Sequence, residues 1–320
     1  MLAIIESPRG ELSNATLTRP LIDSVLDGRT AHTARAYLAD YKDFARFLSS
    51  SGPAIVEGAA GALEALISFA PGTAHSCVIL YRSHLVNRKL SPATIARRLA
   101  ALRTAVKLAR MTGRVTWSLE VESPPQEAYR DTSGPGMDGW LAILEYAEAD
   151  KTPAGIRNLA IVRLLHDLAL RRGEVVGLDL VDYEPSRSAV AVKGKGRHHR
   201  IRLTLSAAAK TSIESWILER GDWAGPLFVS LATGRAVPGS SPLTGEAVRQ
   251  LVKAIAAAAG VDQVVRPHGL RHQAITEALD KTGGDVRRVA RFSRHKRIET
   301  VMKYDDNRAD FAGEIASLIS

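Results

Sequence analysis

The sequence of 320 residues contains almost no cysteine, and this scarcity narrows the classes of protein that it can encode. Its single cysteine, Cys77, has no partner for an internal disulfide, which excludes a disulfide-stabilised secreted fold and favours a reducing compartment. No apolar run approaches the roughly 18 residues of a membrane span. The start, MLAIIESPRG, lacks the basic and apolar regions of a secretory signal. We therefore expect a cytoplasmic protein with no membrane partner.

Sequence signatures of metal and nucleotide sites are also missing. His268 and His272 are four residues apart, but no glutamate follows His268 as in a zinc peptidase helix, and no pair of cysteines is available. The sequence has neither a phosphate-binding loop nor a dinucleotide-binding glycine pattern. We therefore expect no metal and no cofactor.

Two amphipathic helices are predicted in the first half of the chain. In TAHTARAYLADYKDFARFLSS, which Thr30 or Thr33 would cap, the apolar stripe comprises Tyr37, Tyr41, Phe44 and Leu48. In SPATIARRLAALRTAVKLARMTGR, Ser91 is the expected N-cap and Gly113 the expected stop. Its apolar stripe comprises Ile95, Leu99, Leu102 and Val106.

Basic residues outnumber acidic residues by 43 to 34, and the resulting net charge of +9 suits a polyanionic partner. The window 82–114 holds nine lysines or arginines and no acid, whereas solvated helices usually mix charges of both signs. The second amphipathic helix thus carries a basic stripe beside its apolar one. We interpret this stripe, with two arginines on a further face, as a grip on DNA phosphates. The predicted contacts are Arg97, Arg98, Arg103, Lys107, Arg110 and Arg114.

The stretch VESPPQEAYRDTSGPGMDG, rich in proline and glycine, indicates a linker between two domains. We expect an N-terminal helical domain over 1–125, a linker over 126–137 and a second domain over 138–320. In the second domain GIRNLAIVRLLHDLAL predicts an apolar helix, and AVAVKGKGRHHRIRLTL alternates like a β-hairpin with a basic tip. The remainder is mostly helical, so the expected fold class is mainly α with a small antiparallel β-sheet.

Four separate segments place a cation or an imidazole beside a tight turn or a helix start. Each has an ordinary structural interpretation, as a helix-surface ion pair, a common hairpin turn, a helix cap or a packing tyrosine. Their occurrence together, in this order, favours catalysis. The segments contain Arg171 in LALRRGEVVGL, Lys195 in VKGKGRHHRIRL, His268 and Arg271 in RPHGLRHQAIT, and His295 and Tyr304 in RFSRHKRIETVMKYDDN.

In order and spacing these segments resemble the tyrosine recombinase (phage integrase and Xer-like) family. Arg171 matches the family arginine in TGLRxxEL, since Glu174 fixes the register, and Lys195 matches the hairpin lysine. The H-x-x-R box matches HGLRH, and a histidine nine residues before the nucleophilic tyrosine matches His295. The first half is similar to the family's core-binding domain. The resemblance implies a helical (SAM-like) core-binding domain and a helical catalytic domain that form a C-shaped clamp on DNA.

Two positions depart from the family pattern. The family's glycine before the arginine is Ala169, with Leu170 between, and the LGH segment is FSRH, with Arg294 in place of glycine. Neither change removes a chemical group from the expected site. We expect Arg294 to alter the approach to the phosphate near His295.

The resemblance also implies a chemistry. Tyr304 would attack phosphorus and form a covalent 3′-phosphotyrosyl link, while Arg171 and Arg271 stabilise the charge on the nonbridging oxygens. His268 is the candidate base, and Lys195 would protonate the departing 5′ oxygen. Glu174 would orient the arginines.

The expected function is site-specific recombination of double-stranded DNA, with integration, excision, resolution or inversion as the outcome. By resemblance a homotetramer would act on two recombination sites, with a paired recombinase or an accessory DNA-bending protein as further partners. A tail helix over 309–319 would dock into the neighbouring subunit or pack in cis. Two alternatives stay open, a type IB topoisomerase-like enzyme that relaxes supercoils and a catalytically inactive DNA-binding regulator.

Overall fold

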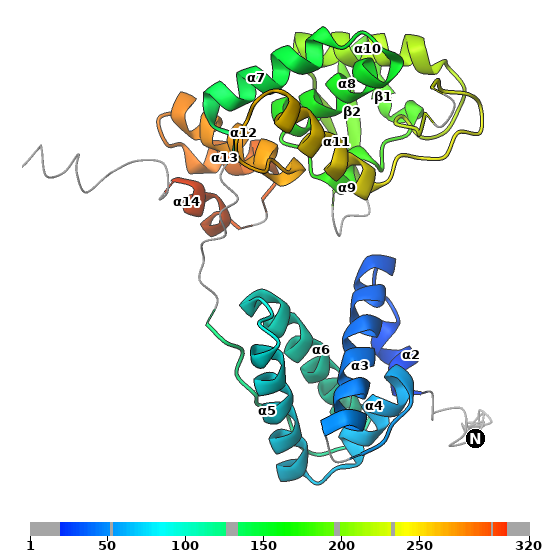
Figure 1. Ribbon diagram of the computed structural model, residues 1–320, viewed down its shortest axis with the longest axis vertical. Coiled ribbons are helices and arrows are strands. Elements are labelled where there is room, and N and C mark those ends of the chain that lie inside the picture. The colour runs from blue at the N-terminus through cyan, green and yellow to red at the C-terminus, as the bar shows by residue number, and fades with distance from the viewer. Residues whose placement is uncertain are drawn as a thin grey trace, which may run out of the picture. The chain divides into compact units, whose positions relative to one another are not determined.

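The structure, a computed structural model, describes residues 20–51, 54–125, 134–194, 199–231, 234–295 and 297–305. The chain divides into two compact units with the boundary between residues 130 and 131. In Figure 1 the first unit runs from blue to cyan and the second from green to red. The predicted tail helix over 309–319 and the predicted Lys195 lie outside the described residues.

The first unit is helical and contains both helices predicted there. Its elements are α2 (Leu21–Leu26), α3 (Ala31–Ser51), α4 (Gly58–Ser68), α5 (Pro71–Asn87) and α6 (Pro92–Met111). Thr30 rather than Thr33 caps α3, because its Oγ1 accepts from the amide of Thr33 at 3.3 Å. Ser91 caps α6 as expected, and Gly113 follows the end of that helix with φ +71°. The two predicted apolar stripes line one core, with Tyr37 alone half-buried.

The second unit is mainly helical with a small sheet. Its helices are α7 (Gly136–Ala149), α8 (Pro153–Asp167), α9 (Arg172–Val175), α10 (Ala207–Arg220), α11 (Gly245–Ala258), α12 (Pro267–Lys281), α13 (Val286–Ser293) and α14 (Glu299–Asp305). Side chains at the N-caps of α8, α10, α11 and α13 accept backbone amides, which explains where these helices begin. Since α7 begins at Gly136, it takes in the last two residues of the predicted linker.

The predicted hairpin is present as part of a three-stranded antiparallel sheet. Strand β2 (Ala189–Lys193) pairs with β3 (Arg200–Thr204), and the pairs Val190 with Leu203 and Val192 with Ile201 place the alternating apolar residues opposite each other. The third strand, β1 (Tyr183–Glu184), was not predicted because two residues are too short for an alternating pattern. The expected fold class, mainly α with a small antiparallel sheet, is confirmed.

Two hydrophobic clusters support the second unit. The larger surrounds α8 and α10 and includes the inner face of β2. The smaller joins α12, α13 and α14, which lie side by side in Figure 1, and it includes Ala169 from the turn after α8 and Tyr304 from α14. The tyrosine-bearing helix α14 is therefore held against α12 and α13 by apolar contacts, in the same cluster as Ala169.

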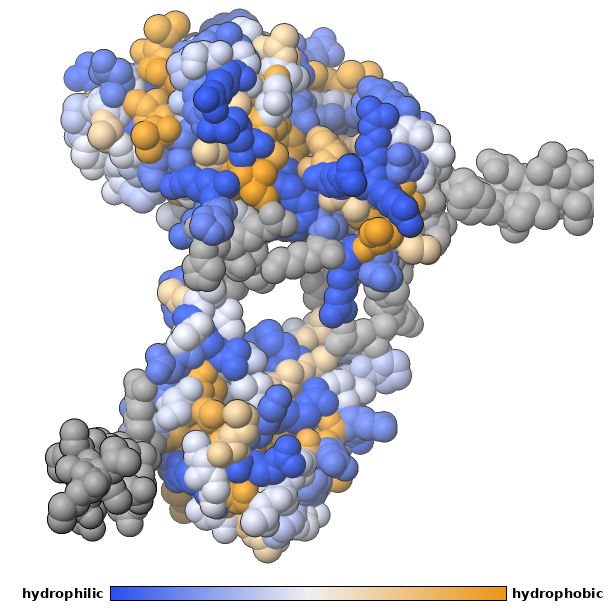
Figure 2. Space-filling view, turned by 180° about the vertical axis from the view of Figure 1, so that it is seen from behind, coloured by the Kyte–Doolittle hydropathy of each residue, from blue (hydrophilic) through white to orange (hydrophobic). Residues whose placement is uncertain are grey.

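Hydrophobic residues are scattered in small groups among hydrophilic ones on the face of the molecule shown in Figure 2. Within the part of the chain that the structure describes, no helix is long and apolar enough to cross a membrane.

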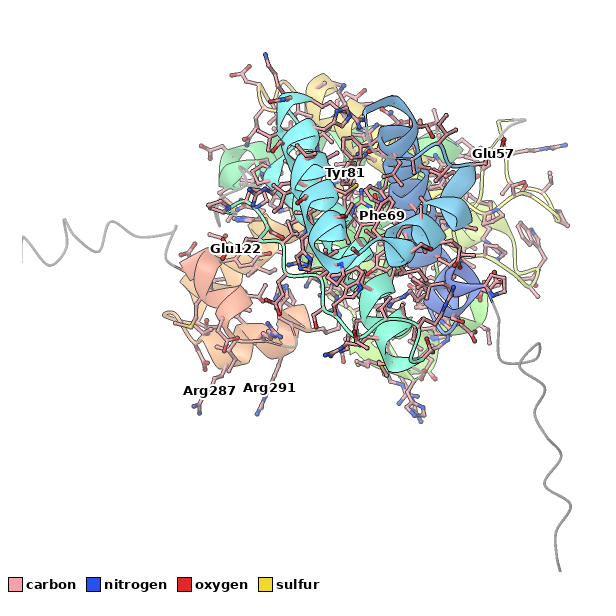
Figure 3. All side chains as sticks on the ribbon, turned by 90° about the horizontal axis from the view of Figure 1, so that it is seen from below. Glu57, Phe69, Tyr81, Glu122, Arg287 and Arg291 are labelled. Atoms are coloured by element: carbon pink, nitrogen blue, oxygen red, sulfur yellow. The ribbon has the colours of Figure 1, made fainter. Side chains whose placement is uncertain are left out.

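Acidic partners for the basic helix α6 come from other helices of the first unit. Asp43 on α3 is buried and accepts from Arg98, from Arg88 at 3.0 Å and from the hydroxyl of Tyr81 at 2.8 Å. Tyr81 lies on α5, as labelled in Figure 3. Asp40 on α3 pairs with Arg97. The window 82–114 therefore contains no acidic residue of its own, but acidic residues of α3 lie beside it in the folded chain.

We predict that Asp43→Ala destabilises the protein by about 3–5 kcal/mol, because a buried arginine and a buried tyrosine hydroxyl lose their acceptor. Urea denaturation followed by circular dichroism measures the change. Glu64→Ala is the matched control: it removes the carboxylate that pairs with Arg114 at 2.5 Å near the surface and should cost less than about 1 kcal/mol. Equal losses in the two variants would contradict the prediction.

Candidate active site

A left-handed turn ends α8 and leads into the first segment that was predicted to be catalytic. Leu168 is the C-cap, and Ala169 follows with φ +45°, a conformation that glycine adopts more readily. The amide of Ala169 donates to His166 O at 2.9 Å, and its methyl group is fully buried in the smaller cluster. The chain then reaches Arg171, the N-cap of α9.

Arg171 and Glu174 are bound to each other at the start of α9. The Glu174 carboxylate accepts from the Arg171 amide at 2.9 Å and from its Nη1 at 2.8 Å. Burial alone would raise the pKa of Glu174, but these hydrogen bonds and the charge of Arg294 outweigh it and lower the pKa. Glu174 is thus an ionised, buried carboxylate, while about a third of the Arg171 side chain, 34%, stays exposed.

Arg271 is buried in the first turns of α12 and is held by backbone carbonyls. Its Nη1 donates to Ala169 O and its Nη2 to Ser293 O, and Nη2 also lies 3.3 Å from His295 Nε2. Burial and the neighbouring charges of Arg171 and Arg294 lower the pKa of Arg271 to about 10, so the guanidinium remains charged at neutral pH. The Arg271 side chain is 1% exposed, so the protein encloses it almost completely.

His295 is held as a neutral imidazole by its two partners. Ser293 Oγ donates its hydrogen to Val289 O, so it accepts from His295 Nδ1 at 2.8 Å. Nε2 then carries no proton and accepts from Arg271. Burial, followed by the charges of Arg271 and Arg171, lowers the pKa of His295 to about 4.

His268 is the second residue of α12 and lies at the exposed edge of the same cluster. Partial burial and then the charges of Arg271 and Arg171 lower the pKa of His268, although its side chain remains solvent-exposed. The imidazole is therefore neutral at neutral pH and has a lone pair with which to accept a proton.

Tyr304 is packed between two histidine rings and is only 8% exposed. Its ring centroid lies 4.6 Å from that of His272 and 5.9 Å from that of His295. Burial raises the pKa of Tyr304, while the charges of Arg271 and Arg171 oppose that rise. The phenol is therefore protonated in this state.

The structure brings together Arg171, Glu174, His268, Arg271, His295 and Tyr304. The sequence analysis missed the place of His272 beside Tyr304. Burial and then His268 lower the pKa of His272 to about 4, so it is also neutral. Its position directly after Arg271 in HGLRH could have indicated that His272 belongs to the site, but we considered this histidine only as a metal ligand. Among the described residues no cluster of three potential metal ligands occurs.

The residues predicted to contact DNA belong to the first unit and differ in their surroundings. Arg97, Arg98 and Arg114 pair with carboxylates, and Arg103 donates to Val121 O and to Ser123. Lys107 and Arg110 are exposed and form no ion pair with the residues described. Contact with phosphates stays a prediction for all six.

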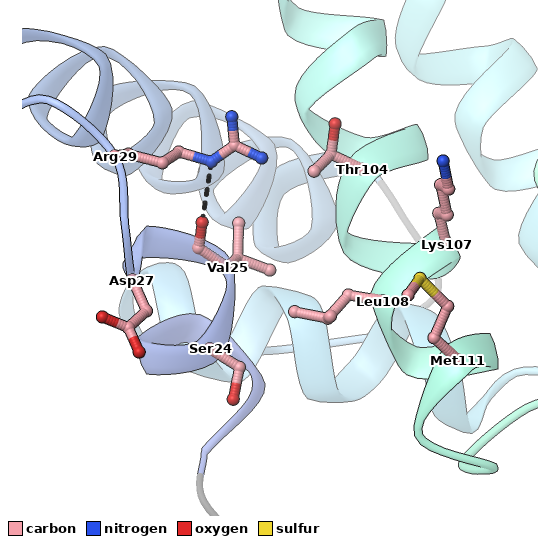
Figure 4. Close-up of a pocket in the computed structure, with 8 residues that line it drawn as sticks. All are labelled: Ser24, Val25, Asp27, Arg29, Thr104, Lys107, Leu108 and Met111. Carbon is pink, nitrogen blue, oxygen red and sulfur yellow. Dashed lines mark hydrogen bonds between the residues drawn. The ribbon is translucent and has the colours of Figure 1, made fainter.

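A pocket of about 330 Å³ lies between α2 and α6 in the first unit (Figure 4). Lys107 and Met111 line it on one side, and Val25 and Arg29 on the other, where Arg29 Nε donates to Val25 O. None of the predicted catalytic side chains lines this pocket. The candidate active site is instead the cluster around Tyr304, where the predicted catalytic residues of the described chain come together.

Comparison with known proteins agrees with this assignment. Residues 139–310, more than half of the chain, match the phage integrase family. The chain belongs to this family. The tyrosine recombinase slr0733 of Synechocystis sp. is 38% identical over 308 residues, 95% of this chain and 96% of that protein. The tyrosine recombinase XerD of Caulobacter vibrioides is 31% identical over 288 residues, 85% of each chain.

A solved lambda integrase tetramer bound to a Holliday junction has the same fold, with a TM-score of 0.64 over 90% of this chain and 77% of the integrase, at 15% identity. Together with its recombinase relatives, family membership identifies this phage integrase family protein as a tyrosine-type site-specific recombinase. The expected enzyme class is confirmed, and neither a type IB topoisomerase nor an inactive regulator is favoured.

We predict that His295 stays neutral, with its proton on Nδ1, down to about pH 4. The pKa of His295 is about 4 in the folded state and about 6.5 in the unfolded state, so as pH falls the unfolded chain takes up the proton before the folded chain does. The contribution of neutral His295 to the free energy of unfolding is therefore complete above pH 6.5 and is lost as pH falls toward 4. Two-dimensional ¹H–¹⁵N NMR of the imidazole measures the midpoint, with the urea-unfolded chain as control. A folded midpoint above 6 would refute the assignment.

Proposed function

We propose that this recombinase cleaves and rejoins duplex DNA through a 3′-phosphotyrosyl link to Tyr304. The observation that carries the proposal is the position of Tyr304 beside His295, whose Nε2 lies 3.3 Å from Arg271 Nη2. The charges of Arg271 and Arg171 also act on the pKa of Tyr304. A tyrosine placed in this way can attack a phosphate that the arginines hold.

The charge balance of the site suits a phosphodiester. Among the side chains that the structure describes, Arg171, Arg271 and Arg294 face one carboxylate, that of Glu174, while the three histidines nearby have lowered pKa values. The excess of fixed positive charge can stabilise the negative charge that develops on nonbridging phosphate oxygens. About a third of the Arg171 side chain is exposed, and it has further N–H donors for a forked contact with phosphate.

The reaction balances with the residues of this chain. Tyr304 Oη forms a bond to phosphorus as the bond from phosphorus to the 5′ oxygen breaks, and the phenolic proton passes to neutral His268. Lys195 donates a proton to the 5′ oxygen. Because the phosphotyrosyl bond conserves the energy of the phosphodiester, attack by a 5′ hydroxyl of the partner strand rejoins DNA without ATP. His295 and Glu174 hold Arg271 and Arg171 in place.

The proposed partner is double-stranded DNA with a specific recombination site. The basic residues of α6, above all the exposed Lys107 and Arg110, would bind its phosphates, and the two units would close on it as a clamp. A homotetramer on two sites, as the lambda integrase tetramer is described on its junction, would exchange the strands.

Tyr304→Phe should bind DNA as the parent does but form no covalent complex, because only the attacking oxygen is lost. A suicide substrate and a denaturing gel measure the adduct. Tyr146→Phe, which alters an exposed tyrosine on α7, is the control and should retain adduct formation. A denaturation-resistant adduct from the Tyr304 variant would show that another residue attacks.

Lys195→Ala should cleave an ordinary phosphodiester poorly but recover on a substrate whose 5′ bridging oxygen is sulfur, since a thiolate leaves without a proton. Single-turnover rates on both substrates test this. Lys210→Ala, on α10, should show neither defect nor rescue. Equal defects on both substrates would assign Lys195 to electrostatic stabilisation or DNA positioning instead.

A further inference from the structure

We propose that Arg294 is a positioning residue that fixes Arg171 for catalysis, an inference that rests on the proposed function. Its guanidinium binds the turn that precedes Arg171 and the carboxylate that holds Arg171. Arg294 occupies the position at which the family pattern has glycine. Unlike glycine, it has a side chain, which connects the end of α13 to α9.

The backbone at Arg294 explains why glycine is usual there. Arg294 is the C-cap of α13, with φ +58° and ψ +34°, in the left-handed region where most side chains are disfavoured. An arginine with this left-handed backbone raises the free energy of the folded state. The contacts of the Arg294 side chain show what offsets that increase.

The Arg294 guanidinium makes at least four hydrogen bonds to the described residues. Nη1 donates to Leu168 O at 2.9 Å and to Phe292 O at 3.0 Å, while Nη2 donates to Ala169 O at 2.9 Å and to Glu174 Oε2 at 3.1 Å. One side chain thereby joins the end of α13, the left-handed turn after α8 and the carboxylate at the start of α9.

These bonds distinguish Arg294 from the arginines proposed to bind phosphate. Its four Nη hydrogens all have protein acceptors and its side chain is only 7% exposed, whereas that of Arg171 is 34% exposed and donates to Glu174 from Nη1. Arg294 therefore acts through its neighbours and not on the substrate. This replaces our expectation that Arg294 would alter the approach of the phosphate.

The route from Arg294 to Arg171 is short. Glu174 Oε2 accepts both from Arg294 Nη2 and from the backbone amide of Arg171, and Oε1 accepts from Arg171 Nη1. Ala169 O, two residues before Arg171, is shared by Arg294 and Arg271. Loss of Arg294 would remove one hydrogen bond to Ala169 O and one to Glu174, so the turn and the carboxylate would be held less firmly and Arg171 would lose its alignment with Arg271.

The test compares Arg294→Gly and Arg294→Lys in single-turnover adduct formation at saturating DNA, well below the thermal transition of each protein. Arg294→Gly relieves the backbone but removes every side-chain bond, so the rate should fall roughly 100-fold while DNA affinity is retained. Arg294→Lys keeps the charge but not the planar fork, and should remain at least about 10-fold slow. Arg287→Ala, on the outer face of α13 in Figure 3, is the matched control and should match the parent.

A double-variant cycle separates positioning from a general effect on folding. If Arg294 acts through Glu174, the double variant Arg294→Gly with Glu174→Gln should be about as slow as the slower single variant. Independent losses that multiply would overturn the proposal, and so would a parental rate in Arg294→Gly. If the parent itself forms no adduct, the proposed function fails and the positioning role fails with it. A parental adduct with an unaffected Arg294→Gly would overturn the positioning role alone.

Discussion

The carbonyl oxygens of Leu168 and Ala169 hold together side chains that would otherwise repel one another. A helix ends with carbonyls that lack amide partners and carry partial negative charge. At the end of α8 these oxygens accept from Arg294 and Arg271, and the chain reaches Arg171 two residues later. Three guanidinium groups are thereby gathered around the carboxylate of Glu174, the one that the described part of the chain places there. The left-handed turn at Ala169 makes this possible because it directs both carbonyls toward α12 and α13.

The unbalanced positive charge has consequences for the groups around it. Burial combines with the arginine charges to lower the pKa of His268, His295 and Arg271, while the same charges oppose the rise in the pKa of Tyr304. A phosphate that enters the site would relieve the repulsion between the arginines. On the proposed function, the interactions that assemble the site would also suit it to an anion, so folding and substrate binding would use the same charges.

Much of this could be predicted from sequence because the relevant patterns are local. Helical spacing predicted α3 and α6 with their buried stripes, and alternation predicted the pairing of β2 with β3. The order of the catalytic motifs predicted the cluster around Tyr304. Contacts between distant segments were not predictable: Asp43 of α3 pairs with Arg98 of α6, and the ring of His272 lies against Tyr304. Charge counted along one helix does not reveal the acids that a neighbouring helix supplies.

The two departures from the family pattern show what those positions require physically. Both have left-handed backbones, so what the fold demands is a conformation and not glycine itself. A left-handed alanine costs about 1–2 kcal/mol. Burying its methyl group recovers about 0.8 kcal/mol, and its smaller unfolded-state entropy recovers a further 0.4–1 kcal/mol or so. Ala169 is thus tolerated at little net cost. At Arg294 the left-handed backbone is offset by the burial of a side chain that is only 7% exposed and by hydrogen bonds that reach Ala169, 125 residues away in sequence. Because that carbonyl belongs to the backbone, Arg294 depends on the left-handed turn at residue 169 and not on the side chain there.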